Sequence, residues 1–339
     1  MNSRLTFLRF IIAIGSVLLV SGILIPRQYN LDYPAALGPI FDPDVKSEHI
    51  QGIRETEPDI ILLGDSVLYQ SVNPELLAEG LKMPIYEMAT PGSGTAAWYL
   101  QMKNIIFDAP HLPKYIVIFF RNTMLTVPQY RTTGRYFALL DDYATKNEPL
   151  VIERAFISQM TPLEKFAQKY IPLYTAREEI RQDMDNALRY LPTALLLNCD
   201  RPCTDDAVSS IFGREVDPVA LNLAQEDAAK TLYAEAELSF EDQIDSSLLL
   251  PMIELAQKNG VKLVFVRSRV YGPEPEMSAY RNSLDTFLTG REGVYLLNYW
   301  NDPRIFESYY VDSLHMNSLG MEKFTEIFMR ELGDIVLQQ

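Results

Sequence analysis

Two short segments near opposite ends of this 339-residue chain carry the residues with the clearest chemistry. In the first, the apolar run Ile61-Leu62-Leu63 leads through Gly64-Asp65 to Ser66. In the second, Asp312 stands three residues before His315, one of only 3 histidines in the chain. A serine becomes an effective nucleophile when a histidine takes its proton and a carboxylate orients that histidine. The two segments therefore predict acyl-transfer chemistry at Ser66, with His315 as the base and Asp312 as its partner.

Apolar runs alternate with helical patterns around these segments, as in proteins with a parallel sheet. We predict strands over five runs rich in apolar and β-branched residues: 59–63, 84–89, 114–120, 261–267 and 294–298. Helices are predicted to start at Pro74, to cover 95–106 and to cover 318–336. The expected fold is α/β: a three-layer sandwich around a five-stranded parallel sheet.

Open α/β sheets place their functional groups at the carboxyl ends of the strands. Ser66 follows the first predicted strand, Gly92 the second and Asn122 the third, whereas Asp312 and His315 follow the fifth. We therefore expect these residues to meet at one edge of the sheet. Asp65 is expected to bond the backbone of the turn rather than to act on a substrate.

An apolar stretch near the N-terminus predicts a membrane anchor. Every residue from Phe10 to Ile25 is apolar or small, and with its flanks the run supplies roughly 17–19 residues, close to the minimum for a spanning helix. Arg4 and Arg9 precede the run and several aspartates follow it soon after, which favours a cytoplasmic N-terminus and an extracytoplasmic remainder. The alternatives are a signal peptide cleaved near Val20-Ser21-Gly22 and a buried globular helix. The apolar run continues past that cleavage point, which favours the uncleaved single-pass anchor.

The predicted organisation has three parts: a cytoplasmic tip and anchor over 1–27, a connector over 28–56 and a catalytic domain over 57–339. The region between Asn122 and Val261 contains no convincing core strand. We expect a mostly helical insertion there, at about 130–240. Helices are predicted in and just after it, near 161–169, 175–190, 218–236 and 241–258.

Charge and cysteine content exclude several kinds of partner. A formal net charge of −15 without a basic stripe argues against binding to nucleic acid. Cys199 and Cys203 are the 2 cysteines, and outside the cytoplasm they favour a local disulfide, the alternative being two free buried thiols. Neither these cysteines nor the scattered histidines have the spacing of a metal site, so we expect no metal and no other cofactor.

The order of these motifs resembles the SGNH (GDSL-like) hydrolase superfamily over about 57–128 and 245–337. In that superfamily a Gly-Asp-Ser turn carries the nucleophile and an Asp-x-x-His near the C-terminus completes the triad, which implies Ser66, Asp312 and His315 here. The resemblance also implies an oxyanion hole built from the Ser66 and Gly92 backbone N–H groups and the Asn122 amide. The segment around Asn122 keeps only the asparagine of the family's Gly-x-Asn-Asp motif.

The resemblance and the anchor imply a membrane-anchored extracytoplasmic serine esterase or O-acyltransferase of the bacterial cell envelope, acting through a Ser66 acyl-enzyme. The architecture is similar to that of DltD-type and alginate O-acetylation proteins, which implies a membrane-bound O-acyltransferase partner and an acylated glycan or lipid as substrate. Two alternatives stay open. One is a lipase or thioesterase for lipid acyl chains, with an apolar groove under the insertion. The other is a degenerate module that only binds a glycan or a partner.

Three arginines follow the third predicted strand in a chain that is otherwise acidic: Arg121, Arg131 and Arg135. They are candidates for holding an anionic group of a substrate. An equally good interpretation gives them solvated or ion-paired positions at the surface. Tyr130 and Tyr136 interleave with them, which suits a sugar, an acyl chain or simple packing.

Overall fold

The computed structural model describes residues 3–41, 48–177, 180, 181, 183, 184, 187, 218–271 and 274–337. The chain forms two compact units, one joining 1–39 with 159–226 and the other joining 40–158 with 227–339. The expected insertion at 130–240 is thus divided, because its first and last parts belong to the second unit. Cys199 and Cys203 lie outside the described residues.

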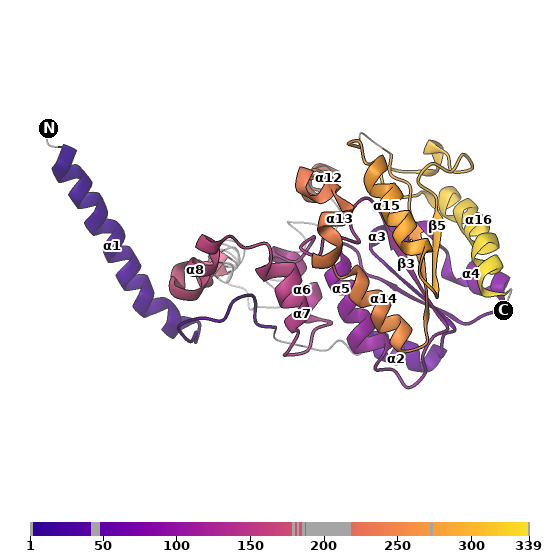
Figure 1. Cartoon of the computed structure of the whole chain (residues 1–339), viewed down its shortest axis with the longest axis horizontal. Coiled ribbons are helices and arrows are strands. Elements are labelled where there is room, and N and C mark those ends of the chain that lie inside the picture. Colours follow the sequence, from indigo (N-terminus) through magenta and orange to yellow (C-terminus); the bar gives the residue numbers. More distant parts are fainter. Residues whose placement is uncertain are drawn as a thin grey trace, which may run out of the picture. The chain divides into compact units, whose positions relative to one another are not determined.

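The larger unit contains a β-sheet, which includes the labelled strands β3 and β5 (Figure 1). The sheet has five strands, all parallel, in the order β2-β1-β3-β4-β5. Its strands are β1 (Ile60–Gly64), β2 (Ile85–Ala89), β3 (Tyr115–Phe120), β4 (Lys262–Arg267) and β5 (Val294–Asn298). Each agrees with a predicted strand to within one residue at either end. Every residue of β1 and β3 is buried, as expected for central strands covered on both faces. The predicted α/β class and parallel sheet are confirmed.

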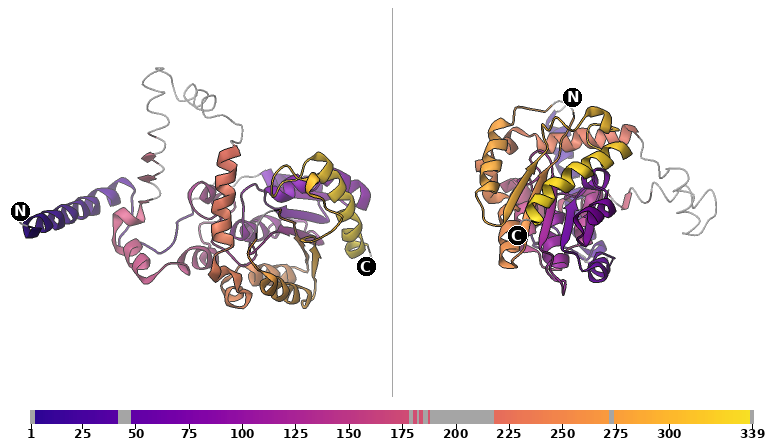
Figure 2. Two further views of the ribbon diagram at one scale, coloured as in Figure 1. Left: turned by 90° about the horizontal axis from the view of Figure 1, so that it is seen from above. Right: turned by 90° about the vertical axis from the view of Figure 1, so that its right-hand side faces the viewer.

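Helices cover both faces of this sheet, and alternate residues of each strand point to opposite sides. Ile61 and Leu63 of β1 pack in a core with α5 (Thr95–Gln101), α14 (Leu249–Lys258) and α15 (Ser278–Thr289). Ile60 and Leu62 pack in a second core with α3 (Ser66–Ser71), α4 (Pro74–Leu81) and α16 (Ser318–Val336). Figure 2 shows helices on either side of the strands, giving three layers.

Local sequence signals set several helix ends. Asn73 caps α4, with Pro74 in the first helical position, and Asn317 caps α16. The helix predicted over 241–258 is broken at Ser247, whose backbone is extended and whose hydroxyl accepts a hydrogen bond from the Leu249 N–H at the start of α14. The other elements of this unit include α2 (Glu48–Thr56), α6 (Phe137–Asp141), α7 (Pro149–Val151), α13 (Phe240–Gln243), π-helical turns at Met102–Ile106 and Ile152–Ile157, and 3₁₀ turns at Gly134–Tyr136, Glu235–Leu238, Ile244–Ser246 and Glu307–Tyr309.

The smaller unit is helical in its described part. It contains α1 (Ser3–Gln28), α8 (Pro162–Tyr170) and α9 (Pro172–Thr175), and α12 (Pro218–Leu232) begins in it. The segment Thr6–Gln28 of α1 is long and apolar enough to cross a membrane, and nearly all of it is exposed. The predicted connector over 28–56 is shared between the units, because the chain passes from one to the other after Pro39 and α2 packs with β2.

Candidate active site

The carboxyl end of β1 is the natural place for a site in this sheet. The chain runs from β1 outward to β2 on one side and to β3, β4 and β5 on the other, so the strand order reverses between β1 and β3. Open α/β sheets bind ligands in the crevice at such a switch point, because the loops diverge there. Ser66 follows β1 at this position, and it begins the short helix α3.

The turn that carries Ser66 is held by its two preceding residues. A side chain on Gly64 would come within 2.8 Å of the Leu68 Cβ, so only glycine allows the chain to turn this sharply into α3. The Asp65 carboxylate accepts a hydrogen bond from the Val67 N–H at 2.9 Å and caps α3, as predicted for this residue. As the first residue of a helix, Ser66 has a backbone N–H without an acceptor in its own helix.

Ser66, His315 and Asp312 are joined in one hydrogen-bonded chain. Ser66 Oγ lies 2.9 Å from His315 Nε2, and His315 Nδ1 lies 2.7 Å from Asp312 Oδ2. Side chains from opposite ends of the sequence thus meet at the predicted edge. His315 is 8% exposed, so its ring is shielded from bulk water while the Ser66 side chain is only half-buried.

The charge of Asp312 determines which ring nitrogen of His315 carries the proton. Burial favours the neutral acid, but hydrogen bonds from the His315 ring and from the backbone N–H groups of Leu314 and His315 outweigh it and lower the pKa of Asp312 to about 2. An ionised carboxylate only accepts hydrogen bonds, so Nδ1 must donate to it. The neutral imidazole then has a bare Nε2 facing the Ser66 hydroxyl, the tautomer that a general base requires.

Backbone contacts fix the loop that carries Asp312 and His315. The Val311 N–H donates to the His315 carbonyl at 2.9 Å, which closes the loop on itself. The Tyr271 N–H, on the segment after β4, donates to the Ser313 carbonyl at 2.9 Å. Gly320 in α16 packs so closely on Tyr309 that a side chain there would lie 2.2 Å from the Tyr309 carbonyl oxygen. These contacts hold the His315 ring and the Asp312 carboxylate in place.

Gly92 lies in a loop that is tied to the end of β1. The Thr90 N–H and the Ser93 hydroxyl both donate to the Gly64 carbonyl, at 2.9 and 3.3 Å. Gly92 itself has a φ of +80°, and a side chain there would meet the ring of Tyr136 at 2.8 Å. The structure therefore places Gly92 beside the Ser66 turn and leaves its backbone uncovered by a side chain of its own.

Asn122 follows β3, the strand on the other side of β1. It has a φ of +50°, a conformation that asparagine tolerates better than most residues. Its side chain is half-buried and forms no hydrogen bond with the described part of the chain. The amide is therefore available to a ligand at this edge of the sheet.

The three arginines have different surroundings. Arg121 is buried, not solvated: its guanidinium donates to the Tyr130 hydroxyl at 3.1 Å and lies 3.7 Å from the Asp65 carboxylate. Burial disfavours its charge, but Tyr130 and Asp65 prevail and raise the pKa of Arg121. Arg121 therefore supports the Ser66 turn through Asp65.

The half-buried Arg131 stacks on the rings of Tyr130 and Tyr136. The central carbon of its guanidinium, Cζ, lies 4.1 Å from the centre of the Tyr136 ring. The side chain of Arg135 is not among those described.

Sequence reasoning missed Ser93 and the Arg121–Asp65 pair. Ser93 accepts a hydrogen bond from the Trp98 indole at 2.8 Å and donates to the Gly64 carbonyl, so it joins α5 to the Ser66 turn. Its position next to Gly92 was the only available signal. Among the described residues, no group of three or more His, Cys, Asp or Glu side chains is placed to hold a metal ion.

Comparison with known proteins does not identify a family for this chain. A scan of the chain against protein-family models finds no match. A search of the curated proteins likewise finds none that matches significantly.

Proposed function

We propose that this protein is a serine esterase or O-acyltransferase of the SGNH type that forms an acyl-enzyme at Ser66. The observation that carries the proposal is the hydrogen-bonded chain from Ser66 Oγ through His315 to Asp312, at 2.9 and 2.7 Å. These distances lie within the range for a nucleophile, its base and the group that orients the base. The switch-point position and the neighbouring Gly92 and Asn122 agree with the resemblance noted in the sequence.

In the proposed reaction, Ser66 Oγ attacks the acyl carbonyl while His315 Nε2 takes the hydroxyl proton. The negative charge that develops on the carbonyl oxygen is stabilised by the Ser66 and Gly92 N–H groups and the Asn122 amide. His315 then returns the proton to the leaving alcohol, and the acyl group stays on Ser66. Water or a second hydroxyl, deprotonated by His315 in turn, attacks the acyl carbon. The bond from the acyl carbon to Ser66 Oγ breaks, the acyl product leaves, and His315 returns the proton to Ser66 Oγ. Asp312 remains ionised throughout and stabilises the imidazolium.

The apolar helix α1 suggests where this chemistry takes place. A single N-terminal span with arginines before it is expected to hold the larger unit on the outer side of the membrane. We infer that the acyl esters belong to a polymer of the cell envelope. A membrane-bound O-acyltransferase is the partner class that would supply or receive such acyl groups. This assignment of substrate and partner depends on analogy with similar architectures rather than on the site.

A fluorophosphonate probe tests the proposal directly. We expect the full-length protein in detergent to become covalently labelled, and mass spectrometry of its peptides to locate the label on Ser66. A folded protein that stays unlabelled would contradict the proposal and favour a module that only binds. Release of p-nitrophenol from acetyl esters in preference to long-chain esters would separate the polymer esterase from a lipase or thioesterase.

The role of Asn122 has its own test, because its backbone conformation allows a clean deletion. Glycine adopts a φ of +50° without strain, so Asn122→Gly removes the amide and leaves the turn intact. We expect acylation by p-nitrophenyl acetate to slow by about 10²–10³-fold, the usual effect of losing one oxyanion donor. The midpoint of thermal unfolding should not fall. An unchanged acylation rate would show that Asn122 serves only the turn.

A further inference from the structure

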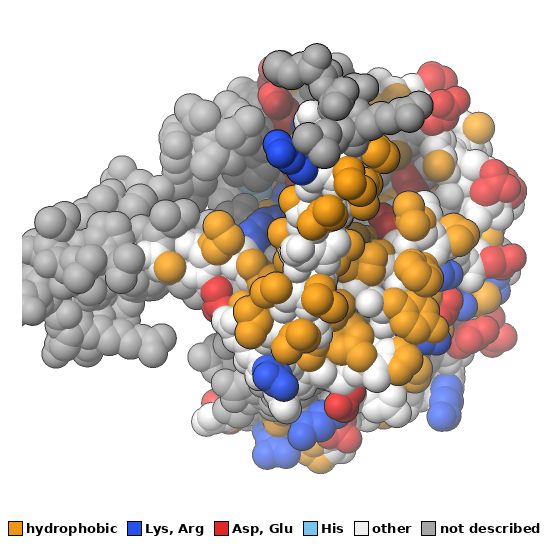
Figure 3. Space-filling view, turned by 90° about the vertical axis from the view of Figure 1, so that its left-hand side faces the viewer, with side chains coloured by type: hydrophobic (Ala, Val, Ile, Leu, Met, Phe, Trp, Pro, Cys, Tyr) orange, Lys and Arg blue, Asp and Glu red, His pale blue; other side chains and the backbone are white. Residues whose placement is uncertain are grey.

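The helices of the smaller unit present an apolar face that the reaction does not use. Leu163, Phe166 and Tyr170 of α8 are 75%, 55% and 50% exposed, and Leu173 of α9 is 40% exposed. The spacing of the first three puts them on one side of the helix. The opposite side packs inward through the buried Gln168, and Ala167, at the edge of the apolar face, is buried as well. The space-filling view in Figure 3 shows hydrophobic side chains, in orange, exposed on the side of the molecule that it draws.

This face is attached to the C-terminal end of α1. The chain leaving α1 runs along α8, where the Ala35 N–H donates to the Lys169 carbonyl at 3.0 Å and the Gln168 amide donates to the Gly38 carbonyl at 3.2 Å. Helix α9 packs directly on α1. Figures 1 and 2 both show α8 beside the C-terminal end of α1.

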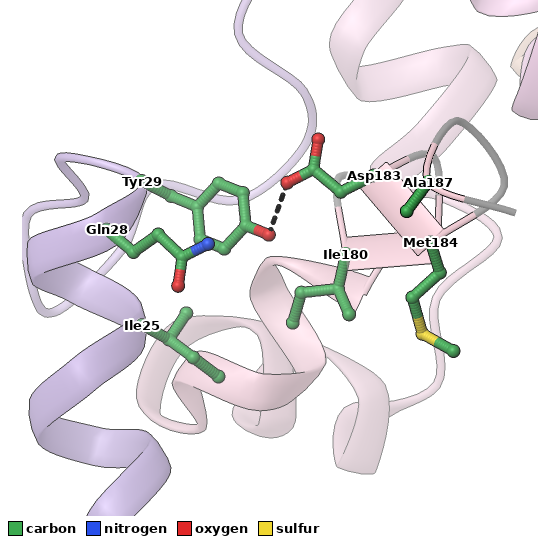
Figure 4. A pocket seen from close by; sticks show the side chains of 7 residues that line it. All are labelled: Ile25, Gln28, Tyr29, Ile180, Asp183, Met184 and Ala187. Atoms are coloured by element: carbon green, nitrogen blue, oxygen red, sulfur yellow. Dashed lines mark hydrogen bonds between the residues drawn. The ribbon is translucent and has the colours of Figure 1, made fainter. Parts of the chain in front are cut away.

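A second set of contacts fixes the same end of α1. The Tyr29 hydroxyl donates to the Asp183 carboxylate at 2.8 Å, and Ile25 faces Ile180 in the hollow between these segments (Figure 4). Ile25 is 7% exposed, whereas the apolar residues before it in α1 are open to the surroundings. The exposed surface of α1 and the apolar face of α8 and α9 therefore adjoin within one compact unit.

The length of α1 puts this junction at the membrane surface. The 23 residues of Thr6–Gln28 extend about 34 Å as a helix, slightly more than the ~30 Å hydrocarbon layer of a bilayer. If α1 spans that layer, its last turn reaches the headgroups. Helices α8 and α9, which pack at that turn, then lie at the same depth.

The composition of α8 suits this depth. Phe166 and Tyr170 belong to the aromatic types that concentrate at the boundary between acyl chains and headgroups. Lys169 borders the apolar face, and its ammonium lies 5.6 Å from the centre of the Tyr170 ring. Long basic side chains can bury their stems beside lipid and keep their charge among anionic headgroups. The acidic Glu164 is occupied by a capping box with Thr161.

We propose that Leu163, Phe166, Tyr170 and Leu173 insert into the headgroup–acyl boundary of the membrane that α1 crosses. The smaller unit then contacts the membrane in two ways: α1 spans the bilayer, and α8 and α9 lie at its surface. The proposal depends on the membrane anchorage in the proposed function, but not on the chemistry at Ser66. Continuity with the lipid-exposed surface of α1 favours lipid over a protein partner as the occupant.

Tryptophan quenching by brominated lipid tests the proposal in the full-length chain. Phe166→Trp is placed in vesicles of phosphatidylcholine and phosphatidylglycerol with bromines either near the headgroup end or near the terminus of the acyl chains. The matched control is Phe306→Trp in the other unit, where the phenylalanine is 54% exposed. The signal of the parent, which contains 2 tryptophans, is subtracted from both.

We expect bromines near the headgroup end to quench Phe166→Trp at least about twofold more than the control, and more than bromines at the chain terminus do. Leu163→Trp should repeat the result. Equal quenching of Phe166→Trp and Phe306→Trp would overturn the proposal. No quenching of Phe166→Trp in vesicles without other proteins would overturn it too, and would favour a protein partner for this face. Release of the chain by carbonate washing would overturn it as well. Quenching in a protein that fails to react with fluorophosphonate would contradict the chemistry at Ser66 only.

Discussion

Ser66→Ala is expected to abolish fluorophosphonate labelling and to slow ester hydrolysis by about 10⁶-fold, because a nucleophile and its base act as a unit. Without the hydroxyl, His315 has no proton to take and no acyl-enzyme can form. The substitution leaves the fold unchanged, since Ser66 is half-buried at the first position of α3 and Asp65 still caps the helix. Mass spectrometry of labelled peptides and p-nitrophenol release measure the two effects.

The control for this prediction is Ser71→Ala, which removes a serine hydroxyl at the other end of the same helix. It should leave both labelling and hydrolysis at the level of the parent. Labelling that persists in Ser66→Ala would place the reactive group elsewhere. Loss of labelling in both variants would mean that the changes act through the stability of α3 and not through the chemistry.

Asp312→Asn is expected to slow acylation by about 10³–10⁴-fold while the protein stays folded. The asparagine carbonyl can still accept the two backbone hydrogen bonds that Asp312 Oδ1 receives at 2.7 Å, so the loop is retained. The asparagine NH₂ group, however, would donate to His315 Nδ1. That forces the ring proton onto Nε2, the nitrogen that must accept from Ser66. Stopped-flow measurement of p-nitrophenol release gives the acylation rate.

Asp334→Asn is the matched control, because it makes the same change at an exposed position of α16. Its acylation rate should equal that of the parent. If Asp312→Asn retained more than about a tenth of the parent rate, the carboxylate would not determine the tautomer, and the proposed role of Asp312 would be wrong.

The same substitution should change how stability depends on pH. The pKa of Asp312 in the folded protein, about 2, lies below its ordinary value of 3.8. Its ionised form therefore stabilises the fold above pH 3.8, and this contribution is lost as the pH falls toward 2. For a partly exposed carboxylate we expect the difference between parent and Asp312→Asn in urea unfolding free energy to shrink by roughly 1–2 kcal/mol over that fall.

Much of the sheet could be predicted from local patterns. The strand Val294–Asn298 and the helix Ser318–Val336 occupy the predicted residues, because an apolar run or an amphipathic period requires only near neighbours in the chain. Two predictions from local patterns, one helix and one insertion, differ from the structure. The helix predicted over 241–258 is interrupted at Ser247, where the backbone is extended and the hydroxyl bonds the Ile244 carbonyl and the Leu249 N–H in competition with the helix. The apparent insertion at 130–240 is also not one body, since contacts distant in sequence divide it.

The sequence by itself determined which residues are available for chemistry. The Gly-Asp-Ser turn and the Asp-x-x-His segment are local, so Ser66, Asp312 and His315 could be named from their types and spacing. Only the tertiary structure decided the 2.9 Å approach of Ser66 to His315 and the burial of Arg121 against Asp65. Both depend on which strand ends become neighbours in the sheet. Local patterns describe how a segment folds, whereas contacts across the sheet follow from the order β2-β1-β3-β4-β5, which no single segment encodes.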